Sequence, residues 1–122
     1  MKTTRQQLGD LGERLAERFL RRMGHKLLAR KFRCQRGEID LITLDPADDC
    51  ICFVEVKSAA RGIDRPEDQV DRRKRARLIA AARTYLKTKK AYDRPRRFDV
   101  IAVVDPAGPE PQIRHWPNAF RP

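Results

Sequence analysis

The sequence predicts an α/β fold, a small mixed sheet with a helix on each face, and three observations support this prediction. Apolar residues recur at helical spacing near the start of the chain. Segments rich in Val, Ile, Leu and Phe, bounded by Gly or Pro, follow as strands. A second helical pattern then precedes another apolar strand. The resulting order, α-β-β-β-α-β, suits a sheet that is covered on both faces.

The chain length limits this fold to one domain. A chain of 122 residues has room for one modest core, and no internal repeat divides it. We therefore expect a single domain over residues 1–122, with its core at about 4–104. An edge strand and a Pro-rich tail are expected over residues 105–122.

The first helix is predicted to begin with a cap at Thr3 or Thr4, to run to about Met23 and to end at Gly24. The stripe expected to face the sheet consists of Leu8, Leu11, Leu15 and Phe19. Glu13 falls at the edge of this apolar face, from which it could point along the sheet surface. On the helical pattern alone, an ordinary surface glutamate is the simpler interpretation.

The remaining elements follow in order. Lys26–Arg33 is predicted as a strand, and the segments around Gly37–Ile42 and Ile51–Lys57 as two more. The loop from Asp45 to Asp49 is short enough to join these two as a hairpin. A second helix from Pro66 to about Lys87, a central strand over Phe98–Val104 and an edge strand over Gln112–Trp116 complete the fold.

The hairpin strands carry charges where a buried strand should have none. The alternation of the second strand places on one face Ile51, Phe53, Glu55 and Lys57. The hairpin would also bring Asp40 alongside Glu55. Because desolvated charges are costly unless a partner or a metal ion is present, these side chains indicate a functional site.

Two converging carboxylates beside a lysine are what a Mg²⁺-dependent phosphodiester hydrolase needs. Mg²⁺ prefers oxygen ligands, which Asp40 and Glu55 would supply, with the Val56 backbone carbonyl as a further ligand. Mn²⁺ would serve as a substitute. The metal ion would lower the pKa of a bound water and neutralise charge on the phosphate. Lys57 could orient or deprotonate that water or stabilise the transition-state charge, although a structural ion pair with Glu55 would place it equally well.

The ordered motifs resemble a known family. The chain contains Gly9-Asp10-Leu11-Gly12-Glu13, then Gly37-Glu38-Ile39-Asp40-Leu41-Ile42, Phe53-Val54-Glu55-Val56-Lys57, a basic helix and Arg97-Phe98-Asp99-Val100-Ile101. This order is similar to that of the YraN-like family of small bacterial proteins, within the PD-(D/E)XK nuclease superfamily, and more remotely to archaeal Holliday-junction resolvases. The resemblance implies a restriction-endonuclease-like domain and the catalytic set Glu13, Asp40, Glu55 and Lys57. One departure is that Ile39, rather than proline, precedes Asp40.

Other polar residues near these motifs have open roles. Glu38 could support the metal site or form a salt bridge with Arg36. Gln69 could contact the metal-bound water or a phosphate. Asp99 begins a buried strand, so we expect a structural role in holding an arginine.

The charge of the chain indicates a polyanionic partner. The formal net charge is +11, and the stretch from Arg72 to Lys90 holds nine basic residues and no acidic one. Solvated helix faces normally mix both signs, so we expect nucleic-acid contact here, with DNA favoured over RNA. The residues expected to make this contact are Arg72, Arg73, Lys74, Arg75 and Arg77.

The composition places the chain in a reducing, aqueous environment. No apolar run approaches the roughly 18 residues of a membrane span, and no secretion signal is recognised. Cys34, Cys50 and Cys52 are odd in number, and the last two fit best as small apolar residues on a strand. A cytoplasmic location is therefore expected, without a membrane partner, and a homodimer is left open.

Three functions remain to be compared. The first is a Mg²⁺-dependent DNA endonuclease acting on structured or branched DNA. The second is a nucleic-acid-binding module on a nuclease fold with little or no catalytic activity. The third is an accessory subunit whose basic helix docks on another protein. Intact Asp40, Glu55 and Lys57 favour the enzyme.

Overall fold

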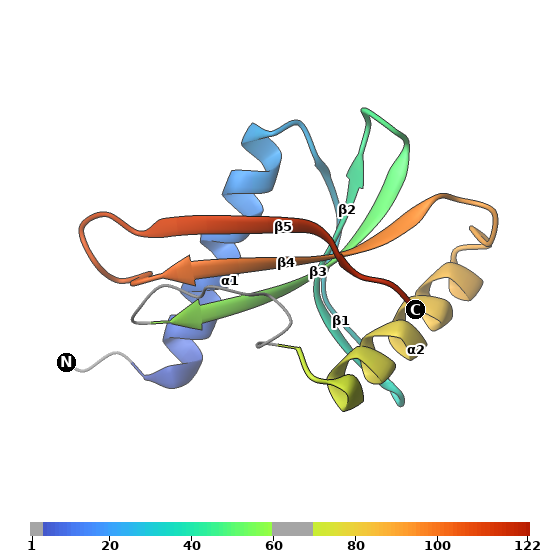
Figure 1. Ribbon diagram of the computed structural model, residues 1–122, viewed down its shortest axis with the longest axis horizontal. Coiled ribbons are helices and arrows are strands. Elements are labelled where there is room, and N and C mark those ends of the chain that lie inside the picture. Colours follow the sequence, from blue (N-terminus) through green and yellow to red (C-terminus); the bar gives the residue numbers. More distant parts are fainter. Residues whose placement is uncertain (1–3, 60–69) are drawn as a thin grey trace.

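The computed structural model describes residues 4–59 and 70–122 and contains one mixed sheet with a helix on each face (Figure 1). In chain order the elements are α1 (Arg5–Arg22), β1 (Lys26–Cys34), β2 (Gly37–Asp45), β3 (Cys50–Ala59), α2 (Arg72–Thr88), β4 (Arg96–Val104) and β5 (Gln112–Phe120). The predicted α-β-β-β-α-β core is confirmed. The expected edge strand is also present and extends beyond Trp116 to Phe120.

The strands lie in the sheet in chain order, β1-β2-β3-β4-β5. The pairs β1–β2, β2–β3 and β4–β5 are antiparallel, whereas β3 and β4 are parallel. A parallel pair needs a crossover connection, and α2 lies within it. The sheet ladder between β2 and β3 ends at the pair Leu41–Val54, which places the candidate residues just beyond its last rung.

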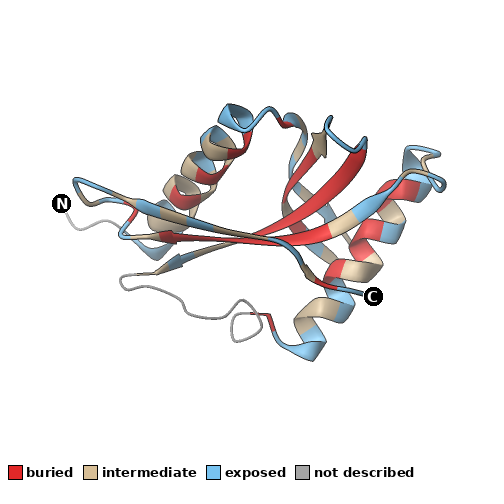
Figure 2. Cartoon of the chain, turned by 45° about the horizontal axis from the view of Figure 1, so that its top comes forward, coloured by how far each residue is buried: buried red, intermediate tan, exposed pale blue. Residues whose placement is uncertain are grey.

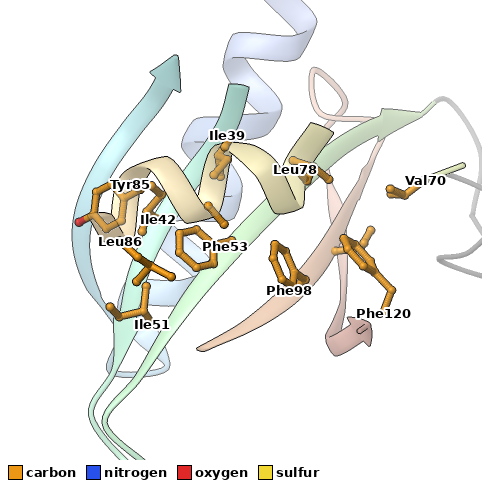
Figure 3. Close-up of a cluster of buried hydrophobic side chains, with 13 residues drawn as sticks. Ile39, Ile42, Ile51, Phe53, Val70, Leu78, Tyr85, Leu86, Phe98 and Phe120 are labelled. Carbon is orange, nitrogen blue, oxygen red and sulfur yellow. The ribbon is translucent and has the colours of Figure 1, made fainter. Parts of the chain in front are cut away.

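Two apolar clusters hold the helices against the sheet. The larger one packs α2 residues such as Leu78 and Leu86 on Phe53 and Phe98 (Figure 3). The smaller one packs α1 on the opposite sheet face, through residues such as Leu20. The predicted alternation of β3 is confirmed, because Ile51 and Phe53 belong to the α2 cluster, whereas Cys52 and Val54 belong to the α1 cluster. The buried residues accordingly follow the inner strands (Figure 2).

The predicted apolar stripe of α1 was one position away from the true contact face. The fully buried positions are Gly12, Ala16 and Leu20, while Leu15 and Phe19 flank them. The reason is close packing: a Cβ atom on Gly12 would overlap Ser58 Oγ, so the smallest residues lie nearest the sheet. The predicted cap is confirmed, since Thr4 accepts a hydrogen bond from the backbone N–H of Gln7 at 3.1 Å.

The second helix begins later than predicted. It starts at Arg72, and the predicted start at Pro66 lies outside the described residues. Asp71 is the N-cap and accepts a hydrogen bond from the backbone N–H of Lys74 at 2.8 Å. Val70 precedes the cap and is buried in the α2 cluster, so it anchors the chain rather than continuing the helix. Neither described helix is both long enough and apolar enough to cross a membrane.

Candidate active site

The candidate site lies where β2 and β3 separate. Past the pair Leu41–Val54 the two strands no longer form ladder hydrogen bonds, and the Asp40 side chain fills the gap. Its Oδ2 atom accepts the backbone N–H of Val56 at 2.7 Å. A strand residue directs its N–H and C=O to the same side, so the Val56 carbonyl also faces this gap. The separation of the two strands therefore leaves room for Asp40, Glu55 and the Val56 carbonyl to face one another, as predicted for a metal site.

Asp40 and Glu55 lie close enough to perturb each other. Burial first, and then the charge of Glu55, raise the pKa of Asp40 to about 7, although the Val56 N–H opposes this shift. Glu55 is 6% exposed and forms an ion pair with Lys74, with Oε1 and Nζ separated by 3.1 Å. The buried Glu55 and the half-buried Asp40 therefore lie near one ammonium group from α2, which is in direct contact only with Glu55. A further cation would compensate the negative charge that Lys74 leaves on this pair of carboxylates.

Glu13 reaches the same place from α1, on the other face of the sheet. Burial raises its pKa, the Lys31 ammonium opposes this, and the charge of Asp40 adds to the increase. Lys31 Nζ lies 3.1 Å from Glu13 Oε2 and 2.8 Å from Asp10 Oδ1. Lys31 has a left-handed backbone, with φ of 48°, at the position between the β1 residues that pair with Leu41 and Ile39. This lysine was not among the site residues predicted from the sequence.

Lys57 lies on the same face of β3 as Glu55, as predicted. Burial lowers its pKa, and the neighbouring Lys74 lowers it further, whereas Glu55 and Asp40 act in the opposite direction. The pKa of Lys74 is raised: burial opposes the increase, and the hydrogen bond with Lys57 and the charge of Glu55 produce it. The ion pair with Glu55 that was considered for Lys57 is formed by Lys74 instead.

Surface hollows on both sides of the sheet separation reach the carboxylates. On the α2 side, Lys74 and Arg77 border a hollow that contains both Asp40 and Glu55. On the α1 side, a second hollow contains both carboxylates together with Glu13. Lys57 borders this second hollow. The site is thus open to solvent from two directions.

The donor atoms fit a hard cation such as Mg²⁺. Asp40, Glu55 and the Val56 carbonyl supply oxygen only, which is the set that Mg²⁺ and Mn²⁺ take in preference to zinc. Within residues 4–59 and 70–122, no group of three or more His, Cys, Asp or Glu side chains has metal-binding geometry. A cation here would consequently use the carboxylate pair with waters, as Mg²⁺ commonly does, and Glu13 would stay paired with Lys31.

The remaining predicted residues have mixed outcomes. Glu38 is exposed and pairs with Arg33 across β1 and β2 at 3.3 Å, so the salt bridge that was one of its two open roles is formed with Arg33 rather than with Arg36. The strand register explains this, because Arg33 lies directly opposite. Gln69 lies outside the described residues. Asp99 is fully buried and holds Arg97, with 3.0 Å between Oδ1 and Nε, which confirms its structural role.

The predicted nucleic-acid residues of α2 divide into two groups. Arg72, Arg73 and Arg77 are exposed. Lys74 is engaged by Glu55, and Arg75 folds back, donating from Nε to the Val70 carbonyl at 2.9 Å. Arg75 also lies over the Phe120 ring, 5.4 Å from its centroid. Among these five residues, the three arginines of the first group are therefore the ones whose side chains the structure leaves exposed.

Comparisons with known proteins decide the family. The model of the "Uncharacterised protein family UPF0102" matches residues 12–103. The chain belongs to the UPF0102 family. This is the YraN-like family indicated by the ordered motifs, and the matched range contains Glu13, Asp40, Glu55 and Lys57.

Curated relatives that carry the UPF0102 name match nearly the whole chain. The one from Trichlorobacter lovleyi is 41% identical over 118 residues, covering 94% of this chain and 91% of the relative. The one from Geobacter metallireducens is 42% identical over 114 residues, covering 93% and 91%. That from Rhodopirellula baltica is 43% identical over 117 residues, covering 93% and 70%. The UPF0102 chain described here therefore spans most of the length of these relatives.

Proposed function

We propose that this UPF0102 protein is a divalent-metal-dependent nuclease. The observation that carries the proposal is the meeting of Asp40 and Glu55 where β2 and β3 separate. The charge of Glu55 helps to raise the pKa of Asp40, and both carboxylates are reachable from solvent, as a phosphodiester hydrolase needs in order to hold Mg²⁺ or Mn²⁺. The resemblance to the PD-(D/E)XK superfamily supports the same interpretation.

Asp40, Glu55 and the Val56 carbonyl would hold the metal ion. When bound, Mg²⁺ would lower the pKa of a coordinated water and neutralise charge on the phosphate. Lys57 is placed to take part in proton transfer at its Nζ atom. Its lowered pKa increases the share of neutral amine, which is the form that accepts a proton. In its charged form the same atom would stabilise the transition-state oxyanion.

Glu13 and Lys74 would act on the carboxylate pair from either side. The Lys74 ammonium compensates Glu55 and, once released from it, is close enough to the site to meet a substrate phosphate. Glu13, held by Lys31, adds negative charge beside Asp40 and so favours a nearby cation. Both residues therefore tune the charge of the pair.

The substrate we propose is DNA, in particular structured or branched DNA. Arg77, one of the exposed arginines of α2, borders the α2-side hollow, so a phosphate backbone lying along α2 would pass the carboxylates. A cytoplasmic location is proposed with it, because the three cysteines are free thiols in a protein that would meet chromosomal DNA.

The Lys74–Glu55 ion pair favours a second candidate function. It compensates one carboxylate without any metal ion, as a nucleic-acid-binding module with little or no activity would require. In that case the basic surface binds DNA and the carboxylates serve only to position Lys74.

Incubation of purified protein with linear, flapped and four-way DNA and with single-stranded RNA tests both candidates. We expect cleavage with Mg²⁺ or Mn²⁺ and none after chelation, and Asp40→Asn should cut nothing. Cleavage that survives both chelation and Asp40→Asn would contradict the proposed site. DNA binding without cleavage of any substrate in either metal would favour the binding module.

A further inference from the structure

The outward face of α1 carries a second strongly basic surface, which is separate from α2. Arg14, Arg18 and Arg22 follow one another at intervals of four residues and are all exposed. At 100° per residue they lie opposite the buried stripe of α1, so they point away from the sheet. We name these three residues, together with Arg21 and Arg30, the α1 surface.

Internal ion pairs neutralise only part of the α1 surface. Glu17 is the acidic residue that lines the same hollow as these arginines, and it pairs with Arg30 at 2.6 Å and with Arg21 at 3.2 Å. Across the part of the chain that the structure describes, Arg18 and Arg22 have no ion pair. Like charges four residues apart on a helix, such as those of Arg18 and Arg22, destabilise it slightly, so an anion from outside the chain is the natural partner.

The α1 surface is continuous with the carboxylates. Arg14, Glu17 and Arg30 line the hollow formed by the α1 surface, and they also line an adjoining hollow. That adjoining hollow contains Glu13 and Asp40. A chain of phosphates lying along α1 would therefore lead directly to the candidate site.

The two basic surfaces approach this site from opposite faces of the sheet. Arg77 of α2 shares a hollow with Asp40 on one side, and Arg14 of α1 shares one with Asp40 on the other. Successive arginines at four-residue intervals are about 6 Å apart along the helix axis, a spacing close to that of neighbouring phosphates in a strand. A regular row of charges suits a regular polyanion better than an isolated anion.

We propose that the α1 surface is a second phosphate-backbone-binding surface, which holds nucleic acid on the side of the carboxylates opposite to α2. The choice of nucleic acid as the polyanion rests on the proposed function. The substrate would then be gripped on both sides of the site, and each grip would contribute its own counterion release.

The experiment measures duplex DNA binding as a function of salt for the full-length protein and three variants. The variant Arg14→Ala/Arg18→Ala/Arg22→Ala should bind about tenfold or more weakly, and the slope of log affinity against log salt should fall by up to about 3, since each lost phosphate contact removes about 0.9. The variant with Lys at the same positions keeps the charge and should retain most of the slope. A control of equal charge change at exposed sites outside both α1 and the Arg72–Lys90 stretch, Arg96→Ala/Arg114→Ala/Arg121→Ala, should leave the slope nearly unchanged. Alanine is a strong helix former, so the α1 variant should keep its helix, which circular dichroism checks.

The outcomes separate this inference from the proposed function. An unchanged slope in the α1 alanine variant, with wild-type cleavage intact, would overturn the inference and leave the nuclease proposal standing. A reduced slope in the α1 alanine variant, together with a wild-type protein that cuts no substrate, would support the inference and contradict the nuclease proposal. Vesicles of phosphatidylserine and phosphatidylcholine test the other large polyanion, because Met23 is 56% exposed beside this surface. Loss of vesicle binding without loss of DNA binding in the α1 variant would assign the surface to a membrane and overturn the inference.

Discussion

The Nζ atom of Lys74 lies 3.1 Å from Oε1 of Glu55, so a cation from α2 and an anion from β3 meet at the candidate site. This contact distinguishes the roles of two lysines, Lys74 and Lys57, which the sequence alone does not distinguish. Lys74 compensates the buried carboxylate, whereas Lys57 stands beside it with a lowered pKa, caused by burial and by Lys74. Removal of the Lys74 side chain should therefore affect stability, whereas removal of the Lys57 side chain should affect cleavage.

The first prediction compares Lys57→Met with Lys74→Met. Lys74→Met leaves Glu55 unpaired and should cost roughly 1–3 kcal/mol of unfolding free energy without a metal ion. Lys57→Met removes a charge that its surroundings disfavour, so stability should barely change, while cleavage should fall by roughly 10² or more. Urea unfolding and single-turnover cleavage measure the two effects. A stable Lys57→Met that cuts at the wild-type rate would remove Lys57 from the mechanism.

The second prediction concerns Asp40 and Glu55 in the absence of metal. Because the two carboxylates repel each other in a buried place, Asp40→Asn should stabilise the protein by roughly 1–3 kcal/mol at about pH 8. Asn keeps an oxygen that can accept the Val56 N–H. The same substitution should abolish Mn²⁺ binding, measured by calorimetry, while DNA binding stays equal or becomes tighter. A destabilised variant that still binds Mn²⁺ would contradict the proposed ligand set.

The third prediction divides the arginines of α2 by their contacts. Arg72→Ala/Arg73→Ala/Arg77→Ala should weaken DNA binding about equally for all sequences and flatten its salt dependence, because these residues are exposed. Arg75→Ala should instead lower stability, since Arg75 donates to the Val70 carbonyl and covers Phe120. Salt titrations and thermal melting distinguish the two. Equal salt slopes for the triple variant and the wild type would place the DNA elsewhere.

The fourth prediction is a loss of stability in acid that arises far from the candidate site. The pKa of Asp99 is lowered: burial opposes the shift, and hydrogen bonds from His115, the Asn118 N–H and Arg97 outweigh it. Its contribution is thus present above the unfolded pKa of about 3.9 and is lost as the pH falls through the folded value. Burial also lowers the pKa of His25, so the folded state resists protonation and stability declines as the pH falls below about 6.5.

Substitutions at both positions check this origin. His25→Gln should flatten the decline between about pH 6.5 and 5, because the titrating group is gone. Asp99→Leu leaves Arg97 and His115 without their buried partner and should cost about 3–5 kcal/mol near neutral pH. Unfolding measured across pH supplies both numbers. A His25→Gln protein with the wild-type pH profile would show that another group governs the decline.

Features that depend on strand alternation and on a short hairpin could be predicted from the sequence. Features that depend on how a helix packs on the sheet could not. Asp40 and Glu55 could be placed together because a short hairpin and the alternation of strand residues determine their positions. The engagement of Lys74 could not be predicted, since it depends on where α2 settles across β3. The stripe of α1 was misplaced for a related reason: hydropathy favours large side chains, whereas the closest helix–sheet contact is made by Gly12 and Ala16.

The separation of β2 and β3 also bears on the order in which the chain can assemble. Asp40 and Glu55 are only one hairpin apart, so early pairing of these strands brings two like charges together. Lys74 arrives only when α2 docks within the long β3–β4 crossover, which carries a larger loop-closure cost. The apolar pairs between the turn and the separation, such as Ile42 with Phe53, must therefore stabilise the hairpin against the repulsion at its open end until that helix is in place. The residues best placed for chemistry are those that make folding harder.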